Sequence, residues 1–275
     1  MLSLAHLTVL PANPLELIEI GARAGFDAVG LRVVPPFPTD VIVPVVGDVA
    51  LQKQIRQRLS DTGVGMFDIE AFWLMPESNL QFMRRAVEIG AEFGARHVLI
   101  VGNDPDASRM RDNFAELCSY CGEFGLRPML EFIPYSQIRS LEEAHAFLEV
   151  TDQDNAGLLV DSLHLSRSGG KATDIASYPN ELFAYMHLCD AKMPAPTGAE
   201  VRTEAREHRL YPGEGALELA DFVTAFPQGT PVSIEAPNSR HAHLSLVEQA
   251  RLAADAAKRL VEEAFANKIT KPDLS

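Results

Sequence analysis

The segments Pro128-Met-Leu-Glu131-Phe-Ile133 and Gly157-Leu-Leu-Val-Asp161 decide the fold. Both are short, mainly apolar runs that carry one carboxylate near the end. Consecutive apolar residues are typical of a strand that is covered on both faces, as in a parallel sheet flanked by helices. Val98-Leu-Ile-Val101 has the same character. The middle of the chain therefore predicts buried parallel strands.

Runs of this kind recur along the chain at intervals of roughly 25 to 35 residues, and each is followed by a segment with helical periodicity. The clearest helix is expected over residues 79–93, because Leu80, Met83 and Val87 follow helical spacing and Gly94 ends it. Further helices are expected over residues 14–24, 217–226 and 245–265. The eight predicted strands cover residues 3–8, 28–33, 65–72, 97–101, 128–133, 157–161, 184–189 and 232–236.

Strand and helix in regular alternation close most simply as a (β/α)8 TIM barrel. The alternative, an open doubly wound sheet, lacks support because neither GxGxxG nor GxxxxGK followed by Ser or Thr comes after the early strands. The length of 275 residues suits one barrel, which needs about 250. We expect a single domain over residues 1–268 and a polar tail over residues 269–275.

Composition narrows the class of protein. No apolar stretch approaches the roughly 20 residues of a membrane span, and the N-terminus reads as a first strand instead of a secretion signal. The net charge of −14 disfavours nucleic acid as a partner. The three cysteines build no disulfide framework, and Cys118 and Cys121 are expected to pack within a helix. A soluble, cytoplasmic protein is the expectation.

Four consecutive predicted strands each end near a residue of a type that binds metal ions. These residues are Glu131, Asp161, His187 and Glu235. Taken singly, a glutamate after a strand is usually a solvated carboxylate. In a barrel, however, the carboxyl ends of the strands share one mouth, and burying carboxylates in aliphatic runs is costly unless they are paired or coordinated. The set predicts one divalent metal ion, Mn²⁺ or Mg²⁺, with Co²⁺ or Zn²⁺ as alternatives.

The sequence resembles the xylose isomerase-like barrels, which include ketose 3-epimerases, inosose dehydratase, hydroxypyruvate isomerase and, more distantly, endonuclease IV. The resemblance covers nearly the whole chain and is most specific in its second half. It rests on Glu131 followed by Phe, on the D-x-x-H of Asp161 and His164, on His187 and Glu235, and on Arg209-Leu-Tyr-Pro-Gly-Glu-Gly215. It implies that Glu131, Asp161, His187 and Glu235 ligate the metal, that His164 and Arg209 bind substrate oxygens, and that the chain forms a homodimer or homotetramer.

The predicted activity is a metal-dependent isomerase or epimerase that acts on a small keto sugar, cyclitol or related polyhydroxy carbonyl compound through an enediolate. Glu131 and Glu235 are the expected catalytic acid and base. Dehydration of an inosose or of 3-dehydroshikimate is the alternative. A barrel without catalytic activity is less favoured, as is an endonuclease IV-like repair enzyme, because the histidines of its three-metal cluster are missing.

Other polar residues are predicted near the mouth. His6, Glu70 and Asn103 follow early strands and are candidates for substrate contact, although buried hydrogen bonding is an equal alternative for His6 and Glu70. Arg32 and Trp73 are further candidates for the lining. The segment 192–208 is longer than a usual connection. We expect it to order over the substrate or against a partner subunit.

Overall fold

The computed structural model describes residues 1–37 and 39–270. Its strands form one closed barrel in sequence order, in which every neighbouring pair is parallel and β8 pairs with β1. The predicted TIM barrel is therefore confirmed. The strands are β1 (Leu2–Leu4), β2 (Ala28–Arg32), β3 (Gly65–Leu74), β4 (His97–Gly102), β5 (Arg127–Glu131), β6 (Gly157–Asp161), β7 (Met186–Leu188) and β8 (Val232–Ile234).

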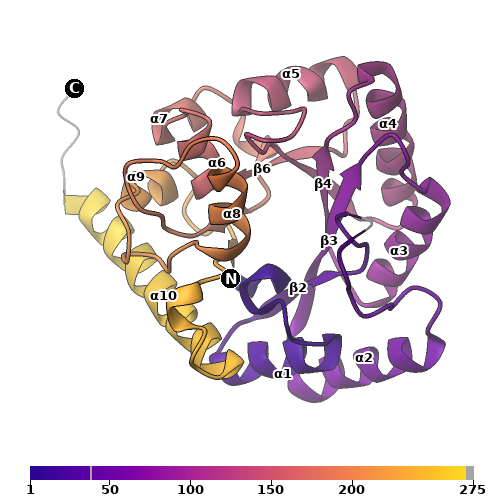
Figure 1. The fold of residues 1–275 in the computed structure, drawn as a ribbon, viewed down its shortest axis with the longest axis horizontal. Helices are drawn as coiled ribbons and strands as arrows, with labels where there is room; N and C mark the ends of the chain where they lie inside the picture. Colours follow the sequence, from indigo (N-terminus) through magenta and orange to yellow (C-terminus); the bar gives the residue numbers. More distant parts are fainter. Residues whose placement is uncertain (38, 271–275) are drawn as a thin grey trace.

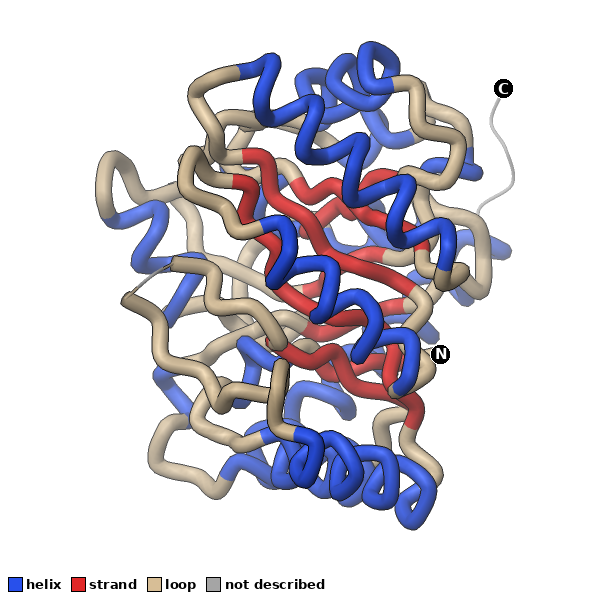
Figure 2. Tube along the Cα trace, turned by 90° about the vertical axis from the view of Figure 1, so that its right-hand side faces the viewer, coloured by secondary structure: helices blue, strands red, loops and turns tan. Residues whose placement is uncertain are grey.

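Helices surround the barrel, and in Figure 1 α1 to α5 and α10 form much of the outer ring. Figure 2 shows the strands as a central layer with helices on either side. The α-helices are α1 (Pro14–Ala24), α2 (Val49–Thr62), α3 (Leu80–Glu92), α4 (Ala107–Glu123), α5 (Leu141–Thr151), α6 (Ser162–Arg167), α7 (Ala172–Ile175), α8 (Glu200–Glu207), α9 (Leu219–Thr224) and α10 (Leu246–Thr270). Short 3-10 helices are η1 (His6–Val9), η2 (Asn180–Leu182) and η3 (Ser239–His241).

The first predicted strand was too long. β1 ends at Leu4, and His6–Val9 forms η1 instead of continuing the strand to residue 8. The ring of His6 explains the turn, because one nitrogen accepts a hydrogen bond from the backbone N–H of Arg32 and the other bonds the carbonyl of Ala12. These two partners fold the chain inward at the mouth of the barrel.

The ends of the helices follow the capping signals in the sequence. Asn13 caps α1 together with Glu16, and Gly25 ends that helix in the left-handed conformation. At the other end of the chain, α10 reaches Thr270, five residues beyond its predicted end, while residues 271–275 of the predicted tail lie outside the described residues. Within the described part, no helix is both long and apolar enough to cross a membrane.

Two apolar clusters hold the structure together. The larger one fills the space between the strands and the surrounding helices, and it includes Cys118 and Cys121 of α4 as buried free thiols. The smaller one lies on the inward-facing side of the strands and includes Phe67, Leu99 and Tyr185. The barrel interior is thus packed with side chains, which leaves the carboxyl ends of the strands as the place for a site.

Candidate metal centre

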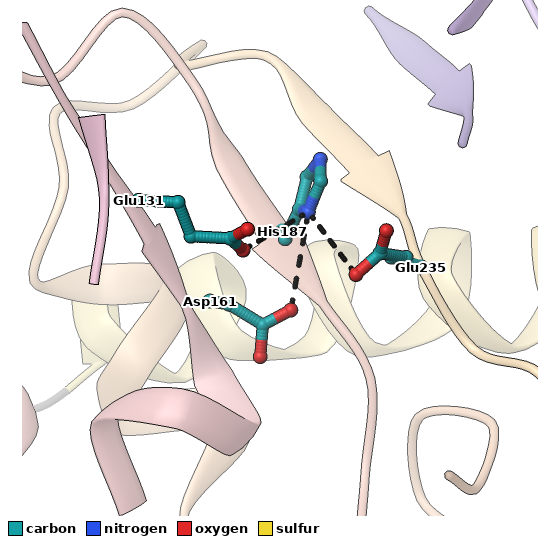
Figure 3. Close-up of side chains that lie close together, drawn as sticks. All are labelled: Glu131, Asp161, His187 and Glu235. Carbon is teal, nitrogen blue, oxygen red and sulfur yellow. Dashed lines mark ion pairs between the residues drawn. The ribbon is translucent and has the colours of Figure 1, made fainter. Parts of the chain in front are cut away.

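Four side chains meet at the carboxyl ends of strands β5 to β8. Glu131 and Asp161 are the last residues of β5 and β6, His187 lies in β7 opposite Asp161, and Glu235 follows β8 directly. One ligand-type atom from each lies within 4.8 Å of all the others. Figure 3 shows the three carboxylates pointing toward the same edge of the His187 ring. The structure therefore brings together the four predicted metal-type residues.

The spacing inside this cluster leaves room for a cation. The Nδ1 atom of His187 lies 3.7 Å from Glu131 Oε1, 3.9 Å from Asp161 Oδ2 and 3.6 Å from Glu235 Oε2. These distances exceed those of normal hydrogen bonds. His187 Nδ1 and Glu131 Oε1 are both buried and have no hydrogen-bond partner among the described residues, which is costly unless another group satisfies them. Three oxygens and one nitrogen form a hard donor set that suits a divalent ion.

The electrostatics of the cluster point the same way. Burial, reinforced by Glu235, raises the pKa of Glu131 well above its ordinary value. Burial also opposes ionisation of Glu235, but Arg209 and His187 outweigh it and hold the pKa of Glu235 well below its usual range. Burial would lower the pKa of His187, yet the surrounding carboxylates raise it to about 10. The carboxylates therefore disfavour one another's ionisation, and positive charge beside them, such as that of a bound cation, would stabilise their charged forms.

Arg209 braces the cluster. Its Nη1 atom donates to Asp161 Oδ2 at 2.6 Å and to the carbonyl of Glu235 at 3.0 Å, and its Nη2 atom lies 2.9 Å from Glu235 Oε2. The Nε atom donates to the carbonyl of Ala205 in α8, and Nη2 is 3.4 Å from His164 Nε2. Every nitrogen of this buried guanidinium is engaged by the protein.

Asp190 is a buried residue beside the site that the sequence analysis did not select. Its carboxylate accepts hydrogen bonds from the backbone N–H groups of Ala191, Gly213, Gly215 and Leu217, at 2.8 to 3.0 Å. A Cβ atom on Gly215 would lie 2.4 Å from Asp190 Oδ1. Because Asp190 also pairs with Leu210 through the backbone, it fixes the turn that begins at Arg209. The signal was an aspartate three residues after His187.

The small cavity next to the cluster has a volume of about 40 Å³. Of the residues predicted to line the mouth, it includes Arg32, Trp73, His164 and Arg209 together with Glu131 and Glu235. It also includes Tyr135 and Arg206, which the sequence analysis did not select. A cavity of about 800 Å³ beside α8 is larger, but none of the four clustered residues lines it. The buried ligand-type groups identify the smaller cavity as the relevant one.

Three predicted contact residues are placed outside this cavity. The two ring nitrogens of His6 are used by Ala12 and Arg32 as described above, and burial lowers the pKa of His6 to about 4. Glu70 accepts a hydrogen bond from the backbone N–H of His6. The side-chain amide of Asn103 contacts the sulfur of Met75. In this structure all three hold neighbouring segments in place.

The segment 192–208 folds differently from the continuous loop expected. Its second half is helix α8, and Ala205 and Arg206 of this helix line the cavity. Figure 1 shows α8 inward of the outer helix ring. Arg167 of α6 anchors the helix through a two-nitrogen ion pair with Glu204. Part of the segment therefore covers the site.

A closed parallel barrel with a buried carboxylate and imidazole cluster at its mouth defines the class: a TIM barrel with a candidate metal centre. The chain belongs to the xylose isomerase-like TIM barrel family, whose sequence profile matches residues 18–263. The resemblance inferred from the sequence motifs is confirmed.

Relatives within reach of sequence comparison carry different activities in their names. The chain is 28% identical over 239 residues to a 3-dehydroshikimate dehydratase of Pseudomonas aeruginosa, which covers 81% of this chain and 36% of that protein. It is 26% identical over 119 residues to an inosose isomerase of Bacillus subtilis, covering 42% of this chain and 41% of the relative. The chain thus spans well under half the length of these two curated relatives.

Solved structures support the fold. The IOLI protein with a bound zinc atom matches with a TM-score of 0.77 and 19% identity over 96% of this chain and 99% of that one. A D-psicose 3-epimerase, solved in the presence of D-fructose, matches with a TM-score of 0.70 and 15% identity over 94% of this chain and 99% of the epimerase. At these identities the likeness extends to the barrel.

Proposed function

We propose that the protein is a divalent-metal-dependent isomerase or epimerase that acts on a small polyhydroxylated carbonyl compound. The observation that carries the proposal is the convergence of Glu131, Asp161, His187 and Glu235 within 4.8 Å, with two of the facing atoms buried and unpartnered. These groups fit a divalent ion in number, charge and donor type. When bound, such an ion supplies Lewis-acid stabilisation of negative charge that develops on a carbonyl oxygen.

Glu131 and Glu235 are proposed as the acid and base. They come from β5 and from the end of β8, and both line the cavity. Their pKa values are pushed in opposite directions, upward for Glu131 and downward for Glu235. A pair of carboxyl groups with separated proton affinities can divide proton removal and proton return. Return to the opposite face of the same carbon epimerises the substrate, and return to the neighbouring carbon isomerises it.

His164 and Arg209 are proposed to position the substrate. His164 is buried and lines the cavity, and burial lowers its pKa to about 4. A neutral imidazole can donate or accept a hydrogen bond from a substrate hydroxyl. Arg209 keeps Asp161 and Glu235 oriented toward the cluster through the contacts described above. It also keeps Glu235 ionised, because its positive charge lowers the pKa of that carboxyl.

Dehydration is the second candidate, because the relative matched over the largest part of the chain is named 3-dehydroshikimate dehydratase. The same two carboxyl groups would serve this reaction. One would remove the proton next to the carbonyl, and the other would protonate the departing β-hydroxyl. The two candidates share the first step and differ in the fate of the intermediate.

Metal analysis and hydrogen exchange test the proposal. Purified protein should bind about one Mn²⁺ or Mg²⁺ per chain, and chelation should remove activity that added metal restores. In D₂O, the loaded protein should exchange a substrate hydrogen in a panel of ketohexoses, inososes, hydroxypyruvate and 3-dehydroshikimate. Exchange without dehydration selects an isomerase or epimerase, whereas the absorbance of a newly formed unsaturated or aromatic product selects a dehydratase. Absence of metal uptake and of exchange with every compound would refute both.

A further inference from the structure

Three arginines line the cavity next to the cluster, and they differ in how many of their nitrogens are already bonded to the protein. Arg209 is fully engaged by Asp161, Glu235, Ala205 and His164. Arg32 and Arg206 also line the cavity, but neither is held in this way. These two guanidinium groups can therefore bind a group of the substrate.

Arg206 reaches the cavity from helix α8. Its Nη2 atom lies 3.1 and 3.3 Å from the two carboxylate oxygens of Asp40, which belongs to the connection after β2. The guanidinium carbon also lies 5.7 Å from the centre of the Phe37 ring, and Phe37 in turn packs against Trp73. Asp40 and Arg206 are both partly exposed, with 20% and 28% of their side chains accessible. This ion pair is therefore weakly held by its surroundings.

Arg32 approaches the same cavity from the end of β2. It is 7% exposed, and its Nε–H has no hydrogen-bond acceptor. The nearest carboxylate oxygen, Oε2 of Glu70, is 3.6 Å away and is itself without a hydrogen-bond partner. A buried guanidinium with an unsatisfied donor costs free energy. A ligand that supplies an acceptor at this point would remove that cost.

We propose that Arg206 and Arg32 bind a carboxylate group of the substrate, so that the substrate is a hydroxylated keto acid and not a neutral sugar. This inference rests on the proposed function for the carbonyl chemistry and adds the group that selects the substrate. Guanidinium groups match carboxylates through paired hydrogen bonds. The ion pair with Asp40 shows that Arg206 accommodates a carboxylate partner.

Exchange of partners at Arg206 would also open the site. The cavity of about 40 Å³ has room for about one water molecule, so a substrate with several carbons requires α8 to move away from Pro36 and Asp40. This movement breaks the ion pair between Arg206 of α8 and Asp40. The same movement frees the guanidinium for the substrate carboxylate. Binding of the acid group and closure of α8 are thereby linked.

Calorimetric binding of three probes tests the inference on Mn²⁺-loaded protein. The probes are quinate, its neutral methyl ester and myo-inositol, which share a hydroxylated six-membered ring and differ in the carboxylate. We expect quinate to bind at least about tenfold more tightly than the other two, as a charge-assisted pair predicts. Equal affinities, no detectable binding of quinate, or tighter binding of myo-inositol 1-phosphate than of quinate would overturn the proposal.

Variants on both sides of the ion pair make the test specific. In Arg206→Gln, the ratio of the dissociation constants of the ester and of quinate should fall close to one. Arg206→Lys should retain part of the preference for quinate. Asp40→Asn removes the internal competitor, so it should strengthen quinate binding several-fold and leave the ester unchanged. A merely structural role for the pair predicts loss in both variants, or no change in preference, and either result would refute the assignment.

Arg202→Gln is the matched control. Arg202 lies on the same helix, and its guanidinium carbon sits 4.4 Å from the centre of the same Phe37 ring, but it does not line the cavity. This variant should keep the preference for quinate. If neutral ketoses undergo hydrogen exchange while quinate shows no preference, only the carboxylate inference fails. If the protein takes up no metal and exchanges no compound, the proposed function fails instead.

Discussion

The first half of the barrel (β1 to β4) and the second half (β5 to β8) both contain buried carboxylates, but the two halves arrange them differently. Strands β5 to β8 each deliver one ligand-type group to a common point, whereas β3 carries two buried carboxylates, Asp68 and Glu70, on a single strand. Both lie against Gly30 of β2, where a Cβ atom would come within 2.3 Å of an oxygen of each. Asp68 accepts a hydrogen bond from Tyr185, and Glu70 lies near Arg32.

The pKa values of the carboxyl groups separate Glu235 from the others, because burial raises the pKa of Glu131 as it raises those of Asp68 and Glu70. Burial, reinforced by its neighbour Asp68, raises the pKa of Glu70 to about 8, and burial raises the pKa of Asp68 to about 6. Glu235 instead stays ionised because Arg209 and His187 overcome the effect of burial. A buried carboxylate is thus no sign of a metal centre by itself. Ligand-type groups from separate strands that meet at one point, as Glu131, Asp161, His187 and Glu235 do, are a better sign.

The largest expected effect comes from removing one carboxylate of the second half. Glu235→Gln takes away a proposed ligand and a proposed proton-transfer group, so turnover should fall on the order of 10²-fold or more. The matched change in the first half is Glu70→Gln, which should reduce turnover less than about tenfold, because a group with a pKa of about 8 is mostly neutral at pH 7. Steady-state kinetics on the substrate found by exchange measures both. Equal losses would erase the distinction between the halves.

Metal binding should stabilise the protein, because a cation at the cluster relieves the repulsion among Glu131, Asp161 and Glu235. At a metal concentration about 100 times the dissociation constant, the gain is about 2.7 kcal/mol, which raises the melting temperature by roughly 5 to 10 °C in a chain of this size. Thermal unfolding with and without Mn²⁺ measures it. Glu131→Gln should lose most of the shift, and Glu70→Gln should keep it. A shift of the same size in both variants would contradict binding at the cluster.

The sequence was sufficient for the second half because each ligand-type residue stands alone at the end of an apolar run. Glu131, Asp161 and His187 are found by locating the apolar runs and looking for the ionisable residue near the end of each. In the first half, the decisive partners are distant in the chain. The turn at His6 depends on the backbone of Arg32, which no local pattern reveals, and so β1 was predicted too long.

The sequence also did not predict that a helix covers the site. The segment 192–208 is rich in charged residues and reads as a loop, but Arg167 and Arg209 hold its second half as a helix through Glu204 and the carbonyl of Ala205. These contacts arise only after the barrel has closed. The same holds for Asp190, whose role depends on backbone groups 23 to 27 residues away.

A smaller effect is expected from Asp190, which holds the turn after Arg209 in the second half of the barrel. Asp190→Asn would turn an amide N–H₂ toward backbone donors that now share the carboxylate. The lost charge-assisted bonds should cost about 2 kcal/mol of unfolding free energy, together with a moderate loss of turnover through displacement of Arg209. Chemical denaturation measures the stability, and Asp221→Asn, at an exposed position of α9, serves as the control. An unchanged Asp190→Asn variant would show that the turn does not need this acceptor.

The smallest expected effect belongs to the first half and concerns pH. Burial, reinforced by Arg127 and Arg96, lowers the pKa of His97 to about 4. The unfolded chain binds a proton at this residue near its ordinary pKa of about 6.5. The stability that neutral His97 contributes is therefore complete above pH 6.5 and is lost as the pH falls toward 4.

At pH 5.5 this loss amounts to about 1 kcal/mol. Denaturation of wild type and His97→Gln between pH 7.5 and 5.5 isolates it, because the variant should lose about that much less stability than wild type over this interval. His97 packs against Phe67 and Tyr185 inside the barrel, and the ring of Tyr185 also packs against His187. No residue of the ligand cluster contributes to the pKa shift of His97. The difference should thus be the same with and without Mn²⁺. A dependence on metal would mean that the interior of the first half and the centre of the second titrate together, and the two halves would no longer be separable.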